Sequence, residues 1–251
     1  MSYNAPGVYV QDVVSGSQSI SQMSSSVGIL IGVTRSGVIG VAQKINSWTE
    51  FIAKYANGLD TPFLENSYLP YAVHGFFNNG GKELYIGSIK KDAVKATKTS
   101  TINKITVTAS SEGEWGNDIK VSLVHGVGYD ENTNKVFDVT ISVGTNDSVT
   151  IPDVTLEDIV ESVMASSKVK QWISDFKLGS VGALAEESFS LEGGSNGSEL
   201  ADADYTSALN MIDYLDDVTM VAIPGQTSTV VNNAILSYCD EHSLFPIIDM
   251  P

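Results

Sequence analysis

The chain has 251 residues, of which 42 % are hydrophobic and 18 % charged, so it can bury one large core or two ordinary ones and is not intrinsically disordered. Its net charge of −16 argues against nucleic-acid binding. Its single cysteine, Cys239, excludes an internal disulfide. No apolar run reaches the ~18 residues that a membrane helix needs. The first twenty residues lack the basic and apolar blocks of a signal peptide, which favours synthesis in a reducing cytoplasm.

The charge is unevenly distributed along the chain. Residues 1–99 carry 8 basic and 6 acidic side chains, a net charge of +2, whereas residues 100–251 carry 6 and 24, a net charge of −18. Opposite ends of two copies could therefore attract each other. Solubility explains the same distribution and is the commoner reason for it.

The N-terminus predicts an extended arm rather than the start of a globular core. A strand-forming segment follows the turn at Ala5–Gly7, and a stretch rich in Ser, Gly and Gln, residues 15–26, then predicts a flexible tether. An isolated strand must pair with a sheet edge, in its own chain or in a neighbouring subunit. We assign the contact between subunits to the side chains of this strand: Val8, Tyr9, Val10, Gln11, Asp12 and Val13.

The first part of the core is predicted to alternate strands and helices. The apolar run Val27–Thr34 is typical of a strand that is covered on both faces, and Val41–Ile45 predicts a short strand. Ser47 is a helix-capping residue, and Glu50, three positions later, completes a capping box.

A helix and a strand come next. Apolar residues between Tyr68 and Phe77 recur at helical spacing, with Asn66 or Ser67 as the cap and Pro70 in the first turn. Gly80 and Gly81 are expected to end the helix, because glycine accepts positive φ. The apolar segment Glu83–Ile89 then predicts a buried strand.

The polar stretch Lys90–Ser100 is interpreted as a linker and a domain boundary, and Gly193–Gly197 as a hinge. The sequence between them predicts short strands followed by two helices, at Lys104–Ala109, Ile119–His125, Val136–Val143, Leu156–Ser166 and Val169–Phe176. The remainder predicts a helix, a buried strand, a helix capped by Ser228 and a second buried strand, at Tyr205–Leu215, Val218–Ile223, Thr229–His242 and Leu244–Ile248.

Together these elements predict an α/β (α+β) fold, with a core sheet flanked by helices and built from both ends of the chain. The predicted parts are the arm and tether (1–26), a first core segment (27–95), an inserted β-rich outer domain (96–200) and a second core segment (201–251). A domain of this kind rarely ends directly after a strand, so we expect closing elements beyond Pro251.

The sequence offers no candidate for catalysis, cofactor binding or metal binding. Its three histidines lack the spacing of metal ligands, and it contains no P-loop, dinucleotide-binding glycine pattern or nucleophile elbow. We therefore expect a protein that is not an enzyme and needs no cofactor. An α/β enzyme and a ligand-binding or adhesion module remain the alternatives, because such folds host many activities.

Four stretches together resemble the tail sheath proteins of contractile phages, which are related to the sheaths of R-type bacteriocins and other contractile injection systems. They are Ala5–Val10 with Val27–Gly32, Phe76–Gly81 leading into Leu84–Ile86, Gly113–Ile119, and Val221–Gly225 with Pro246–Asp249. In the third stretch we expect a structural turn, with Trp115 buried, Gly116 at positive φ and Asn117 completing the pattern.

The resemblance implies a conserved core with an inserted outer domain and an N-terminal arm that adds a strand to a neighbour. It also implies a helical sheath that polymerises around an inner tail tube and contracts to drive that tube through a cell envelope. The implied partners are further copies of the chain, the tube protein, and baseplate and tail terminator proteins, without nucleic acid or direct membrane insertion. The implied location is a virion tail or related particle, assembled in the bacterial host cytoplasm.

Overall fold

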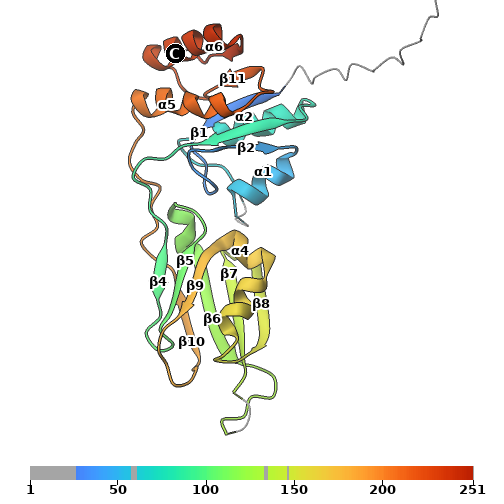
Figure 1. The fold of residues 1–251 in the computed structure, drawn as a ribbon, viewed down its shortest axis with the longest axis vertical. Helices are drawn as coiled ribbons and strands as arrows, with labels where there is room; N and C mark the ends of the chain where they lie inside the picture. Colours follow the sequence, from blue (N-terminus) through green and yellow to red (C-terminus); the bar gives the residue numbers. More distant parts are fainter. Residues whose placement is uncertain (1–26, 58–60, 133–134, 146, 251) are drawn as a thin grey trace, which may run out of the picture.

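The computed structural model describes residues 27–57, 61–132, 135–145 and 147–250. The molecule is elongated, with a five-stranded sheet and its helices at one end and the residues 97–190, here called the middle region, at the other (Figure 1). Two connecting segments, residues 91–96 and 191–201, run side by side between the two parts. The predicted arm, including Val8–Val13, lies outside the described residues.

Strands from both ends of the described chain share the five-stranded sheet, whose order is β12-β11-β1-β3-β2. The strands are β1 (Gly28–Gly32), β2 (Ala42–Ile45), β3 (Leu84–Ser88), β11 (Met220–Ala222) and β12 (Phe245–Ile247). All neighbours pair in parallel except β2, which runs antiparallel to β3. The α/β class and the shared sheet expected from the sequence are thus confirmed.

Helices cover both faces of this sheet, which explains why its central strands are continuously apolar. On one face lie α1 (Trp48–Tyr55) and α2 (Leu69–Asn78), which pack on side chains such as Leu84 and Ile86. On the other face lie α5 (Asp202–Ala208), the 3₁₀ helix η2 (Leu209–Tyr214) and α6 (Thr229–His242), which pack on Ile29 and Ile31.

The helix caps differ in part from those predicted. The Ser47 hydroxyl does cap α1, accepting a hydrogen bond from the Glu50 amide at 3.1 Å. Neither Asn66 nor Ser67 caps α2, because that helix begins after Tyr68 and the Ser67 hydroxyl donates to the carbonyl of Val33. The Ser228 hydroxyl likewise donates to Asp202 instead of capping α6.

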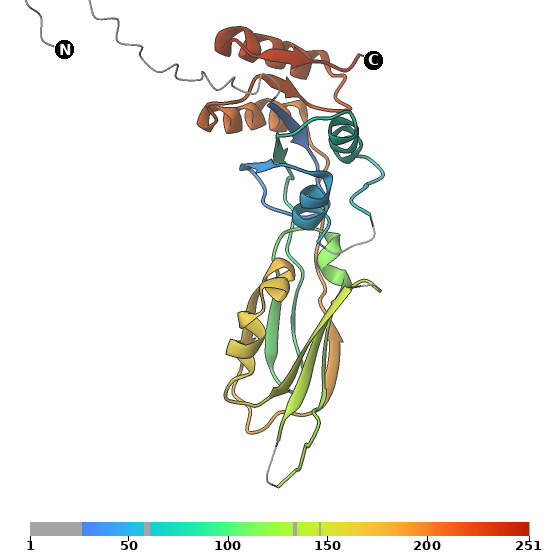
Figure 2. The ribbon, with the colours of Figure 1, turned by 90° about the vertical axis from the view of Figure 1, so that its right-hand side faces the viewer.

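The middle region contains two antiparallel sheets around one core (Figure 2). The four-stranded sheet has the order β10-β6-β7-β8, with β6 (Ile119–His125), β7 (Phe137–Val143), β8 (Asp147–Val154) and β10 (Glu187–Ser190). The three-stranded sheet has the order β4-β5-β9, with β4 (Thr97–Thr99), β5 (Ile105–Ala109) and β9 (Ile173–Leu178). Helices α3 (Ile159–Ala165) and α4 (Ser167–Trp172) contribute to the same core.

Two of the predicted elements differ from those in the structure. The second helix predicted over Val169–Phe176 ends at Trp172, and the chain then continues as strand β9. The stretches interpreted as a linker and a hinge contain the two connecting segments. They pair with each other at Lys91–Ser198, Val94–Ser195 and Thr97–Glu192, so each supplies backbone partners to the other.

The second difference concerns β12, which is not a buried strand. It is an outer strand of the five-stranded sheet, and the side chains of Phe245 and Ile247 are 65 % and 48 % exposed. Apolar composition identified the strand but not its position at the edge.

Candidate functional site

The candidate site lies where the five-stranded sheet meets the middle region. On the sheet side are the loop that follows β1 and Lys90, which stands two residues after the end of β3. On the other side is the segment 111–118, which ends in the 3₁₀ helix η1 (Glu114–Asp118). We call the contacts between these elements the joint. They connect residues that are distant in sequence, as in the 3.0 Å hydrogen bond from the Gly37 amide to the Ser111 hydroxyl.

Gly113 stands at the centre of the joint. Its backbone has φ of 135° and ψ of 161°, a region that is essentially restricted to glycine. A Cβ atom there would lie 2.9 Å from the Lys90 Nζ and from the Trp115 Cδ1, and 3.0 Å from the Arg35 carbonyl oxygen. Both the backbone and the surroundings therefore require a residue without a side chain.

The prediction of a positive φ at Gly116 is wrong, since the residue of this turn with that conformation is Gly113. Gly116 lies inside η1 and is needed for a different reason. A Cβ atom there would lie 2.8 Å from the Cβ of Ala96 and 2.9 Å from the Cβ of Ala109. Its role is close packing between η1 and the sheet below it.

The two other predicted residues of this turn are held firmly. Trp115 is only 2 % exposed and belongs to the core of the middle region, as expected, but its indole Nε1 has no hydrogen-bond partner among the described residues. Asn117 binds the backbone of Gly194 twice, donating through Nδ2 to the carbonyl at 3.0 Å and accepting from the amide at 2.8 Å. Asn117 thus connects the segment 191–201 to η1 through two hydrogen bonds.

Gly80 and Gly81 lie at the other end of β3, where α2 ends. Gly80 has φ of 89°, as predicted for a residue that ends a helix. Gly81 is not in the positive-φ region, but a Cβ atom there would come within 2.3 Å of the Phe76 ring. These glycines shape the turn from α2 to β3 and take no part in the joint.

Lys90 is the joint residue that sequence reasoning missed. Its amine donates to the carbonyls of Glu112 at 2.8 Å and Arg35 at 3.1 Å, one from each side of the joint. Burial lowers the pKa of Lys90 to about 8, although the nearby Glu112 and Glu114 act in the opposite direction. A lysine pair after an apolar strand resembles any surface lysines, so the sequence contained no signal for this role.

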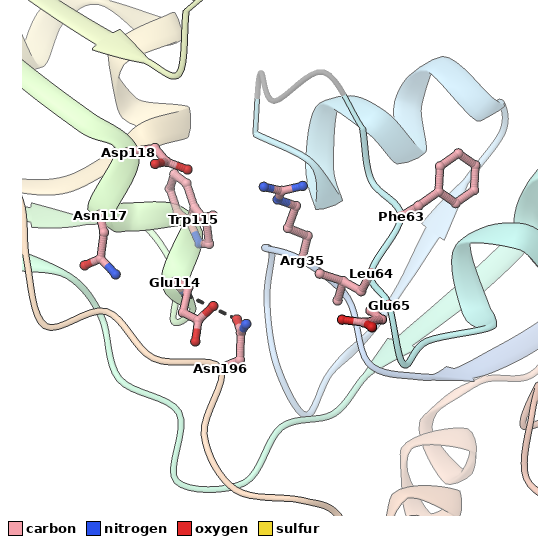
Figure 3. Close-up of a pocket in the computed structure, with 9 residues that line it drawn as sticks. All are labelled: Arg35, Phe63, Leu64, Glu65, Glu114, Trp115, Asn117, Asp118 and Asn196. Carbon is pink, nitrogen blue, oxygen red and sulfur yellow. Dashed lines mark hydrogen bonds between the residues drawn. The ribbon is translucent and has the colours of Figure 1, made fainter.

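Two adjoining cavities border the joint. One of about 420 Å³ is lined by residues from both sides, among them Arg35, Glu65, Glu114 and Asp118 (Figure 3). The other, of about 830 Å³, shares four residues with it, Leu64, Glu65, Glu114 and Asn196, and reaches Lys90. The polar groups in these walls are mostly carboxylates, amides and the two cations Arg35 and Lys90.

The described residues contain no group of three or more His, Cys, Asp or Glu side chains that could hold a metal ion. Within the same residues, no helix is long and apolar enough to cross a membrane. Cys239, a free cysteine on the buried face of α6, belongs to the core between that helix and the five-stranded sheet, and burial raises the pKa of its thiol.

No protein-family model and no curated protein matches this sequence. The solved structures that share its fold include two sheath tail proteins. The crystal structure of a sheath tail protein from Listeria innocua matches with a TM-score of 0.63 and 19 % identity, over 89 % of this chain and 48 % of that one. A sheath tail protein from Desulfitobacterium hafniense matches with a TM-score of 0.62 and 21 % identity, over 95 % of this chain and 51 % of that one.

The expected resemblance to sheath proteins is thus confirmed at the level of the fold. The chain spans about half the length of the two solved sheath tail proteins that it matches.

Proposed function

We propose that this chain is a structural, non-enzymatic part of a contractile tail sheath subunit, located in a phage tail or a related contractile particle. The observation that carries the proposal is the shared fold, which extends over 89 % and 95 % of this chain in two sheath tail proteins. A match of this extent includes the five-stranded sheet and the middle region together. A protein that shared only a common α/β core would match a smaller part of this chain.

In this proposal, copies of the subunit form a helical tube around an inner tail tube. Head-to-tail contacts that do not close into a ring generate an open helix. Residues 27–95 and 201–251 form the conserved core, and residues 96–200 form an inserted outer domain. On contraction the subunits rotate and slide against each other, and the tube is driven through the target envelope. Tube, baseplate and tail terminator proteins are the further partners, and assembly takes place in the host cytoplasm.

Two features of the chain support contacts between copies. The uneven charge, +2 over residues 1–99 and −18 over residues 100–251, favours attraction between unlike ends. The outer strand β12 has exposed apolar side chains at Phe245 and Ile247, and an outer strand can pair with a segment of another subunit. The predicted arm, Val8–Val13, is a segment of suitable composition for such pairing.

Electron microscopy of the protein expressed from its whole gene tests the proposal. We expect tubes or stacked rings with a regular helical repeat. A sample that contains only uniform monomers over a range of salt and protein concentrations would contradict it, because sheath subunits must associate with each other.

A ligand-binding module is the second candidate, and one observation favours it. The larger cavity lies beyond the carboxyl ends of β1 and β3, where open α/β sheets commonly bind ligands, and it contains the partly buried amine of Lys90. A screen of small anionic metabolites by thermal shift tests this candidate. A saturable stabilisation of a monomer that is lost in Lys90→Met would favour it over the sheath.

A further inference from the structure

The joint holds a cation that lacks an ionic partner. Lys90 forms two hydrogen bonds, both to backbone carbonyls, and no carboxylate of the described residues forms an ion pair with its amine. Its neighbour Lys91, in contrast, is exposed and paired with Asp204. The charged or titratable side chains around the Lys90 amine and its cavities are Arg35, Glu65, Glu112, Glu114, Glu199, Asp204, Tyr205 and Tyr214.

The other hydrogen bonds of the joint are made by uncharged groups. Across the joint, the Gly37 amide donates to the Ser111 hydroxyl at 3.0 Å. Beside it, the Gly113 amide donates to the carbonyl of Val94 in the connecting segment at 3.1 Å. Separation of the joint would expose the Lys90 amine to water, and hydration favours the charged form of a lysine. The free energy of separation is therefore coupled to the charge of Lys90.

We propose that the joint is a proton-sensitive latch between the five-stranded sheet and the middle region, closed more tightly when Lys90 is neutral and opened more readily when Lys90 is protonated. The neutral amine keeps two N–H groups, which is enough to donate to both carbonyls. The proposal does not depend on the sheath function, because it concerns the internal geometry of one chain.

The sign of the pH dependence follows from linkage. In the closed joint the pKa of Lys90 is about 8, whereas the pKa of a hydrated lysine is 10.5, so the closed form binds the proton less tightly. Raising the pH from about 8 to about 10.5 then shifts the equilibrium toward the closed form by about tenfold for each pH unit. Below about pH 8 both forms are protonated, and the equilibrium no longer changes with pH.

Hydrogen exchange at the Gly37 amide measures this equilibrium, because that amide donates across the joint to Ser111. Exchange would be followed by mass spectrometry between about pH 6.5 and about pH 9 and corrected for the intrinsic rate at each pH. We expect protection to be constant up to about pH 8 and to rise about tenfold by about pH 9. The Ile141 amide, between β6 and β7, reports the core of the middle region and should not show this rise.

Two variants make the test specific. Lys90→Met removes the titrating group, so the pH-dependent rise in protection should disappear. Lys91→Met removes an exposed neighbour and should keep the wild-type profile. A rise that persists in Lys90→Met, or flat protection in the wild type, would overturn the proposal. If Lys90→Met does not fold, the pH dependence of protection in the wild type alone decides whether the proposal holds.

Discussion

Single residues decide how the two parts of the molecule meet, and Gly113 is the clearest case. The turn has two glycines, Gly113 and Gly116, and composition cannot tell which of them has positive φ. The structure shows that one is required by its backbone conformation and its surroundings, and the other by close packing alone. The burial of Trp115 could be predicted, because a tryptophan in a glycine-rich turn is a large apolar side chain that needs a core.

We predict that Gly113→Ala destabilises the chain more than Gly40→Ala. Both residues have positive φ, but a Cβ atom at Gly40 meets nothing within 4 Å, whereas at Gly113 it meets Lys90, Trp115 and Arg35. Overpacking should add about 1–3 kcal/mol to the backbone strain that both variants carry. Urea unfolding of the two variants measures the difference. Equal losses of stability would mean that the joint can relax around a methyl group.

At the scale of elements, sequence patterns located the strands with strong apolar character, such as β1, β3, β6 and β7. They missed β8 and β10, because alternating short polar segments such as Glu187–Ser190 resemble loops. They also misplaced β12, because composition does not distinguish an inner strand from an outer one. The pairing of the two connecting segments could not be foreseen, since a polar segment reveals no partner until the fold brings one beside it.

Strand β10 provides a pH test at this scale. The Glu187 carboxylate accepts hydrogen bonds from the backbone amides of Thr101, Ile102 and Asn103, between 2.8 and 3.0 Å. Burial would raise the pKa of Glu187, but the backbone hydrogen bonds from Asn103 and Ile102 prevail and lower it to about 2. The folded state therefore binds this proton less tightly than the unfolded chain. Its stabilising effect is complete above about pH 4.5 and is lost as the pH falls toward about 2.

We expect Glu187→Gln to be less stable than the wild type at pH 7, and the difference to shrink steadily as the pH falls below about 4.5. Thermal unfolding from pH 7 to about pH 3 measures it, with the exposed Glu157→Gln as the control variant. A difference that stays constant over this range would show that the amide replaces the carboxylate at the 101–103 turn and that charge is unimportant there.

At the scale of the whole molecule, the sequence predicted a sheet built from both ends of the chain, and the pairing of β1 with β11 confirms it. The elongated shape and the joint could not be predicted, because they depend on contacts such as those of Lys90 that leave no periodic pattern. The arm could be predicted only as a sequence feature, and its role in assembly remains a proposal. Its deletion is therefore the most direct test of how the subunits connect.

We predict that deletion of residues 1–20 from the protein expressed from its whole gene leaves a folded, soluble subunit that no longer polymerises. In the proposed assembly a donated strand would contribute main-chain hydrogen bonds, each of about 0.5–1.5 kcal/mol, and its tether would let the core rotate during contraction. Circular dichroism measures folding, and negative-stain microscopy measures assembly.

Two point variants provide a matched comparison. Val10→Pro should weaken assembly, because it removes a backbone donor from the strand, whereas Ser19→Pro in the tether should not. Ordered tubes of normal length from the truncated protein would show that the arm is not the connector, and failure to fold would place the strand in the subunit's own core.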